Sequence, residues 1–188
     1  YIYYSDVNVV EGELDIEYKN ININFEDKEG VAAIVNKENE EMSKSPVYDE
    51  TNEEANYNHL ISAKFAKYEI IHYVDYITLV VNKYSFDYKT IITTLGSDVY
   101  VFDKTSGKLY NNDELLSKFS VNKDGIKEKL ETYLNDKNLV SEENKIDVQK
   151  TISNNTKYNL YVDKLGRLVI SILVKAEKSD YNDIIVLS

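Results

Sequence analysis

The stretch Val99-Tyr-Val-Phe-Asp-Lys-Thr-Ser-Gly-Lys-Leu-Tyr-Asn-Asn-Asp-Glu-Leu-Leu116 contains the change from strand to helix that organises this chain. Its alternating pattern predicts a strand that ends at Asp103, with Tyr100 and Phe102 on one face. A tight turn is expected at residues 105–108, because the glycine there tolerates the positive φ that such turns need. The strand therefore ends in a turn that leads directly into a helix.

Helices are predicted after this turn. Asn112 or Asp113 is expected to cap a helix over residues 112–119 by accepting from its free N–H groups. Apolar residues at helical spacing predict a second helix over 123–136. A weaker helix is predicted from Ser141, because two glutamates in its first turn favour a helix N-terminus.

Long strands are predicted on both sides of these helices. Three of them cover residues 57–73, 76–86 and 89–103, with a turn near Val74-Asp75. A closing hairpin is expected from strands 157–163 and 167–175, and residues 184–188 suggest a final short strand.

The N-terminal region predicts two strands and a helix. The strands are Ile2–Val10 and Asp15–Phe25, and a change of apolar phase between residues 18 and 21 predicts a bulge in the second strand. Residues 27–45 are expected to be helical, and residues 46–56 are expected to form an exposed acidic loop.

The order of elements predicts the fold class. It is typical of an α+β fold, in which an antiparallel sheet of long strands packs against a few helices. A ββα N-terminal part over residues 1–56 precedes strands, helices and a closing hairpin over residues 57–188, and the two parts are expected to form one compact unit.

The net charge of −11 lies entirely in the first 54 residues, which carry fifteen acids and four lysines. Residues 55–188 carry eighteen acids and eighteen basic residues. Such a field repels nucleic acid and favours a cationic partner, so nucleic-acid binding is excluded. The acids expected to form the binding surface are Glu38, Glu40, Glu41, Asp49, Glu50, Glu53 and Glu54.

Histidine and cysteine, which serve often in catalytic and metal sites, are scarce. The chain has no cysteine, and its two histidines, His59 and His72, are too far apart on one predicted strand to share a metal. No metalloprotease, serine-hydrolase or phosphate-loop motif occurs. We therefore expect neither enzymatic activity nor a cofactor.

Two further features leave alternatives open. Seventeen tyrosines favour a half-buried sheet surface, and the alternative is an aromatic platform for sugar or protein. Residues 120–131 match part of a calcium-binding loop, but a helix start capped by Asn122 or Asp124 explains the same residues.

Four segments in the same order resemble the RsiV-like extracytoplasmic domains of Gram-positive bacteria, which also accompany PdaC-type deacetylases. The segments are Ile21–Glu26, Tyr68–Ser85, the Asp-x-x-x-Gly-Lys turn at 103–108 with its short helix, and Tyr161–Ile170. The resemblance assigns residues 1–56 to the PdaC-type part and residues 57–188 to the RsiV-like part.

The resemblance implies a domain at the cell surface of a membrane-anchored or lipid-anchored protein. In RsiV-type anti-sigma factors such a domain binds lysozyme, a strongly basic protein. We therefore predict a non-enzymatic extracytoplasmic sensing or binding domain for a cationic protein such as lysozyme. The alternative is an accessory module that binds cell-wall glycan. Because no signal peptide or membrane-spanning run occurs, we expect the anchor to lie outside this sequence.

Overall fold

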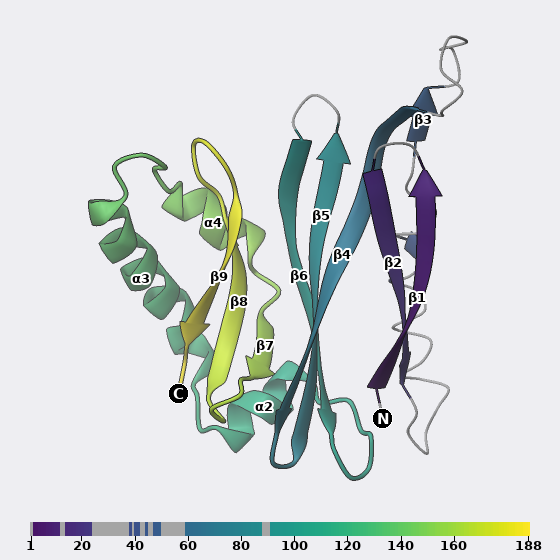
Figure 1. The fold of residues 1–188 in the computed structure, drawn as a ribbon. Coiled ribbons are helices and arrows are strands. Elements are labelled where there is room, and N and C mark those ends of the chain that lie inside the picture. Colours follow the sequence, from purple (N-terminus) through teal and green to yellow (C-terminus); the bar gives the residue numbers. More distant parts are fainter. Residues whose placement is uncertain are drawn as a thin grey trace. The chain divides into compact units, whose positions relative to one another are not determined.

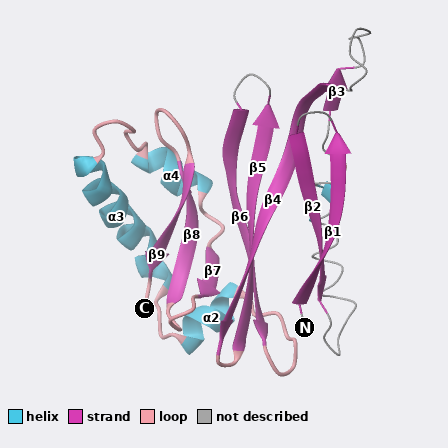
Figure 2. Cartoon of the chain, in the orientation of Figure 1, coloured by secondary structure: helices cyan, strands magenta, loops and turns pink. Residues whose placement is uncertain are grey.

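The computed structural model describes residues 2–11, 14–23, 38, 40–41, 44, 47–49, 59–87 and 91–188. It has the predicted α+β fold, with antiparallel pairing and a group of helices (Figures 1 and 2). The chain divides into two compact units, residues 1–68 with 83–93 and residues 69–82 with 94–188. The predicted boundary after residue 56 lies outside the described residues.

The first unit begins with a hairpin of β1 (Ile2–Glu11) and β2 (Leu14–Ile23). The register runs without a break from the Ile2–Ile23 pair to the Glu11–Leu14 pair. The predicted bulge is therefore wrong. The change of apolar phase occurs inside a regular ladder, because main-chain hydrogen bonds set the register whatever face the side chains occupy.

The acidic segment after this hairpin is described at a few positions. Glu38, Glu40 and Glu41 are helical, as predicted, and the rest of the helix expected over 27–45 lies largely outside the described residues. The loop predicted over 46–56 is wrong in one part, because β3 (Val47–Asp49) pairs with β4 (His59–Tyr73). Short edge strands are held by main-chain bonds to a neighbour and need no apolar alternation of their own.

The three predicted long strands are confirmed as β4, β5 (Tyr76–Asp87) and β6 (Ile91–Asp103). The sheet order is β3-β4-β5-β6, and the predicted turn at residues 74–75 joins β4 to β5. Each long strand contributes residues to both units.

The rest of the second unit contains three helices, one short 3-10 turn and three strands. These are α2 (Asn112–Lys118), the 3-10 turn Lys123–Gly125, α3 (Ile126–Val140), α4 (Val148–Asn154), β7 (Asn159–Val162), β8 (Leu168–Val174) and β9 (Tyr181–Val186). The first two predicted helices and the closing hairpin are confirmed, and the final strand covers 181–186 instead of 184–188.

Two predictions about helices in this unit are wrong. The N-cap of α2 is Asn111, whose side chain accepts from Glu114 N at 2.8 Å, and neither Asn112 nor Asp113 takes this role. No helix begins at Ser141. The next helix is α4, capped by Asp147, whose side chain accepts from Lys150 N at 3.0 Å. Acids after a serine favour a helix start, but the apolar residues needed to hold a helix against the core come later, around α4.

The core of the second unit is built around β8, which is buried along both faces. Leu173 lies against Gly96 of β6, whereas Ile172 pairs with Asp183 of β9, which contacts α3. Because strand side chains alternate, one face of β7–β9 packs on the helices and the other on the second-unit residues of β5 and β6. Figure 1 shows α3 and α4 on one side of β8.

Candidate functional site

The predicted acidic residues that the structure describes are partly paired within the chain. The side chain of Glu38 is only 12% exposed, and its Oε2 lies 2.9 Å from Lys83 Nζ. Glu40 forms an ion pair with Lys44, whose hydrogen bond and charge lower the pKa of Glu40. Glu41 is exposed.

The remaining predicted binding residues lie partly or wholly outside the described part of the chain. The backbone of Asp49 belongs to β3, and its side chain lies outside the described part. Glu50, Glu53 and Glu54 also lie outside the described residues. The sequence-based site is therefore described only at its first three glutamates, and two of these are held by lysines.

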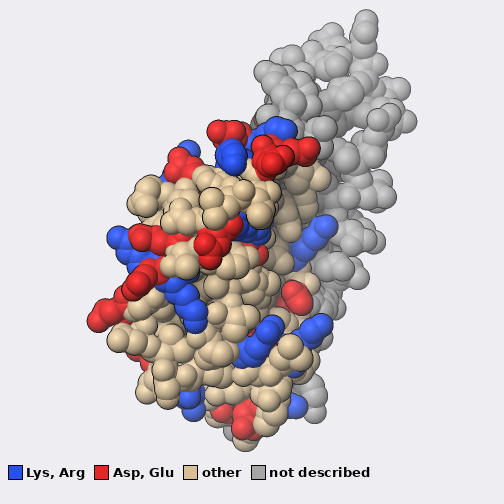
Figure 3. Space-filling view, turned by 90° about the vertical axis from the view of Figure 1, so that its left-hand side faces the viewer, with Lys and Arg blue, Asp and Glu red and all other residues tan. Residues whose placement is uncertain are grey.

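A shallow groove of about 670 Å³ runs between α3 and β9 in the second unit. Its lining residues are Gly125, Glu128, Lys129, Thr132, Tyr133, Asp136, Ile184, Ile185 and Val186. Ile184 is 52% exposed and Val186 is 38% exposed, so the strand wall presents apolar surface to solvent. The face that carries α3 shows charges of both signs among broad areas of uncharged side chains (Figure 3).

Side chains of α3 hold β9 beside the helix. Tyr133 OH donates to Asp183 Oδ2 at 2.9 Å, and Lys137 Nζ donates to the same oxygen at 2.6 Å. Lys129 Nζ donates to the carbonyl oxygen of Leu187 at 3.0 Å. Burial and then the hydrogen bond to Asp183 raise the pKa of Tyr133. The groove therefore has a fixed wall on each side.

Two of the three charged residues that line the groove are acidic. Glu128, Thr132 and Asp136 are exposed and lie four residues apart, so they share one face of α3. Neither Glu128 nor Asp136 forms an ion pair with any residue that the structure describes. Lys129 turns its amine to the backbone of Leu187. By strand alternation with Asp183, the exposed side chains of Ile184 and Val186 lie on the face of the sheet away from α3, whereas the two carboxylates lie on the α3 side. This arrangement suits a partner segment that carries basic groups on one face and apolar groups on the other.

The main chain of β9 also faces this groove. Among the described strands β9 pairs only with β8, so it is an edge strand. Leu187 N donates to Leu168 O at 2.9 Å, which sets the alternation of the antiparallel ladder. By that alternation the N–H and C=O groups of Asn182, Ile184 and Val186 point away from β8. Asp183 Oδ1 accepts from Ile184 N at 2.9 Å, so one outward N–H is already satisfied.

Sequence reasoning did not identify this groove. The run Ile184-Ile185-Val186 was a usable signal, because three consecutive apolar residues in a strand place apolar side chains on both faces. The polar face of the helix predicted over 123–136 could also be recognised from the sequence. The proximity of this helix to the apolar strand could not be predicted, because 48 or more residues separate the two segments in the sequence.

Residues 120–131 form a helix start in the structure. Asn122 Oδ1 accepts from Asp124 N at 3.0 Å, which confirms the predicted capping by Asn122. No group of three or more His, Cys, Asp or Glu side chains that could hold a metal is found within the described ranges. His72 is exposed, and the side chain of His59 lies outside those ranges.

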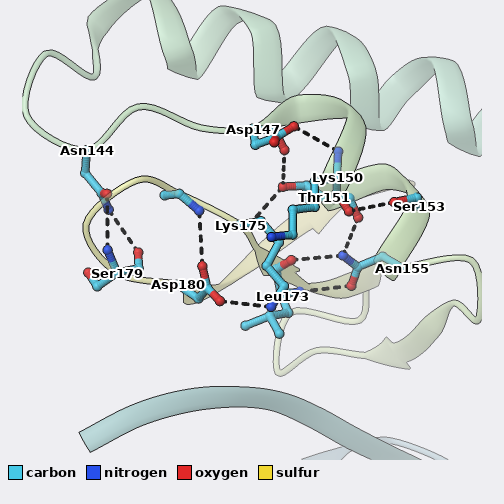
Figure 4. A network of polar contacts seen from close by, with 11 residues as sticks. Asn144, Asp147, Lys150, Thr151, Ser153, Asn155, Leu173, Lys175, Ser179 and Asp180 are labelled. Atoms are coloured by element: carbon cyan, nitrogen blue, oxygen red, sulfur yellow. Dashed lines mark hydrogen bonds and ion pairs between the residues drawn. The ribbon is translucent and has the colours of Figure 1, made fainter. Parts of the chain in front are cut away.

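A second polar cluster joins α4 to β8 and the loop before β9 (Figure 4). Asn155 Nδ2 donates to Leu173 O at 2.9 Å, and its Oδ1 accepts from Leu173 N at 3.0 Å. Thr151 Oγ1 accepts from Lys175 N at 2.9 Å. Lys175 Nζ lies 2.9 Å from Asp180 Oδ2. Because these side chains are bonded to main chain or to each other, the cluster holds the loops in place.

Comparison of the chain with protein-family models and with curated proteins finds no match. In the part of the chain that the structure describes, no helix has both the length and the apolar character needed to cross a bilayer. The groove between α3 and β9 and the distribution of charge are the features that bear on function.

Proposed function

We propose that this protein is a non-enzymatic extracytoplasmic binding domain that recognises a cationic protein, with the groove between α3 and β9 as its contact surface. The observation that supports this most is the combination of an exposed apolar strip on β9 with Glu128 and Asp136 on α3. Extracytoplasmic location and a lysozyme-like partner are suggested by the sequence resemblance.

Affinity for the partner and steering of the partner have different physical sources. Ile184 and Val186 supply apolar area, and its burial contributes roughly 25 cal/mol per Å² before the costs of association. The net charge of −11 steers a basic protein toward the domain and raises the rate of encounter. The two carboxylates at the groove then favour basic side chains on the partner over acidic ones.

The test is titration calorimetry of the whole chain against lysozyme at about 0.15 M and about 0.5 M salt, where the Debye length falls from ~8 Å to below ~5 Å. Saturable one-to-one binding that persists at the higher salt supports the proposal. Binding that disappears there shows only attraction between opposite net charges. Absence of binding at both salt concentrations contradicts a lysozyme-like partner.

A charge-matched pair of double variants locates the contact surface. Glu128→Gln with Asp136→Asn removes both carboxylates of the groove, and we expect binding to weaken about fivefold to tenfold. Glu143→Gln with Glu177→Gln makes the same change in net charge at exposed positions outside the groove, and we expect less than a twofold effect. Equal effects of the two pairs would mean that only the total charge matters.

Glycan binding is the second candidate, because two tyrosine rings lie at or near the groove. Tyr133 lines the groove, and Lys137 Nζ lies over the rings of both Tyr133 and Tyr181. Tyrosine rings of this kind can stack on sugar faces. Competition by soluble peptidoglycan fragments distinguishes the two. Fragments that bind with no dependence on Glu128 or Asp136 would favour the glycan-binding module.

A further inference from the structure

We infer that the partner enters the groove as an extended segment that adds a strand to the edge of β9, and that this segment carries basic residues four positions apart with apolar residues between them. The inference rests on the proposed function and specifies how the groove recognises its partner. Addition of a strand to an open sheet edge is an established mode of peptide recognition.

The pairing of β9 with β8 fixes the direction of the main-chain groups of β9. Leu187 N donates inward to Leu168 O, so the outward groups of β9 belong to Asn182, Ile184 and Val186. Ile184 and Val186 also line the groove. An incoming strand therefore finds the N–H and C=O of Val186 and the C=O of Ile184 facing it.

Asp183 partly closes the edge of β9 at Ile184. Its Oδ1 accepts from Ile184 N, and its Oδ2 accepts from Tyr133 and Lys137. A charged side chain at an edge strand hinders indiscriminate pairing with other sheets. The edge is consequently open toward Val186 and partly closed at Ile184, which selects a short segment in preference to a long flat strand.

The spacing of residues along α3 matches the spacing along β9. Lys129 reaches Leu187 and Lys137 reaches Asp183, so eight residues of α3 run alongside four residues of β9. Eight helical residues extend roughly 12 Å, and four strand residues extend roughly 13 Å. Glu128 and Asp136 are likewise eight residues apart. Basic residues at positions i and i+4 of an added strand would therefore face these two carboxylates.

Side chains of an added strand alternate between the two faces of the sheet. Asp183 and Ile185 share the face of the sheet that lies toward α3, whereas Ile184 and Val186 share the other face. Residues i and i+4 of the partner would lie on the α3 side. Residues i+1 and i+3 would lie beside Ile184 and Val186, where apolar side chains bury the most exposed surface.

The test uses three synthetic peptides and the full 188-residue chain, with binding measured by fluorescence anisotropy. The first peptide is acetyl-Thr-Lys-Val-Thr-Val-Lys-Thr-amide. The second has the same composition with the two lysines adjacent. The third keeps the sequence of the first and carries N-methyl groups on both valines and on the central threonine, so that main-chain donors on both edges of the segment are removed. We expect the first to bind at least tenfold more tightly than either of the others.

A variant of the protein tests the same main-chain hydrogen bonds by removing a donor from β9 instead of from the peptide. Val186→Pro removes an outward N–H and leaves the pairing of β9 with β8 in place, because proline is tolerated where the edge N–H faces away from the ladder. Val186→Ala keeps the N–H and removes most of the side chain. We expect Val186→Pro to weaken binding of the first peptide at least fivefold more than Val186→Ala does. If Val186→Pro does not fold, the comparison of the methylated and unmethylated peptides decides.

The outcomes separate the two proposals. Equal binding of the three peptides, or no peptide binding while lysozyme binding still depends on Glu128 and Asp136, overturns strand addition and leaves the proposed function standing. Lysozyme binding that does not depend on Glu128 and Asp136, together with selective binding of the first peptide, overturns the groove as the lysozyme contact surface and supports strand addition. Failure of every probe overturns both.

Discussion

Gly166 is a position where backbone conformation and packing both exclude a larger residue. Its φ is +76°, and a Cβ placed there would lie 2.6 Å from Tyr73 Oη and closer still to the ring carbons. The ring of Tyr73 therefore packs directly on the bare backbone of the turn between β7 and β8. Gly125 has a φ of −82°, and no atom lies within 4 Å of the position that a Cβ would take there. Replacement of Gly125 by alanine therefore serves as the control for the same replacement at Gly166.

We predict that Gly166→Ala lowers the free energy of unfolding by about 2 kcal/mol, because it combines left-handed strain with overlap. Gly125→Ala should leave stability unchanged or raise it by up to about 1 kcal/mol. Urea denaturation of both variants checks this. Adding Tyr73→Ala to Gly166→Ala should relieve the overlap, and a double variant with no recovery would show that φ strain alone is responsible.

Asp103 holds the turn that leads from β6 to α2. Its Oδ1 accepts from Ser106 N at 2.7 Å and from Thr105 N at 3.0 Å, and its Oδ2 accepts from Tyr110 OH at 2.9 Å. The Ser106 backbone hydrogen bond, followed by the Tyr110 hydroxyl, lowers the pKa of Asp103 from 3.8 to about 2. The carboxylate form is therefore the one that the folded turn stabilises.

A carboxyl group whose pKa is depressed by folding stabilises the protein above its unfolded pKa and loses that contribution as the pH falls through the folded pKa. We predict that Asp103→Asn costs about 1–2 kcal/mol near pH 6. The difference from wild type should shrink between pH 4 and pH 2. Urea denaturation across that range measures it, and a difference that stays constant with pH would contradict the ionised role of Asp103. Tyr110→Phe should show a smaller loss of the same kind.

At the scale of elements, α2 shows how a helix start is decided one residue away from where the sequence pattern places it. Asn111 has extended backbone angles and caps the helix, as a residue just before the first helical turn must. Asn112 is already helical, and its Nδ2 donates to Tyr158 O at 2.7 Å. Adjacent asparagines therefore have different roles, one local and one long-range.

We predict that Asn111→Ala destabilises the protein by about 1 kcal/mol, because Glu114 N loses its side-chain acceptor. Asn111→Asp keeps the acceptor and adds a negative charge at the helix N-terminus, so its stability should equal or exceed that of wild type. Urea midpoints of the two variants check the pair. Equal losses for both would rule out capping as the role of Asn111.

At the scale of the whole molecule, burial is concentrated where β8 lies within the second unit. Leu168, Val169, Ile170 and Val174 are fully buried, and helices and β-strands cover the two faces of this strand. Amides in such a position exchange with solvent only when the surrounding unit opens.

We predict that the amides of β8 are the slowest to exchange in deuterated buffer, and that the exposed C-terminal turn of α3 at Leu139 and Val140 exchanges much faster. Mass spectrometry of peptides from the exchanging protein measures this. Exchange in β8 as fast as in the α3 terminus would mean that this strand does not belong to the most stable part of the molecule.

Local periodicity in the sequence determined the main elements. The long strands of residues 59–103, the helix over 126–140 and the hairpin of β7 and β8 were predictable, because alternating and 3.6-residue patterns report which side of an element is buried. The charge distribution along the chain and the scarcity of histidine and cysteine were also available from the sequence. Short elements such as β3 and α4 were not predicted, since few residues carry little periodic signal.

Only the tertiary structure decided which surfaces come together. The pairing of Glu38 with Lys83 withdraws one predicted binding residue from solvent, and no local pattern links residues so far apart. The groove exists because Tyr133 and Lys137 of α3 meet Asp183 of β9. Sequence patterns fix the faces of single elements, whereas a site formed between two elements depends on long-range packing whose energy is shared over the whole core.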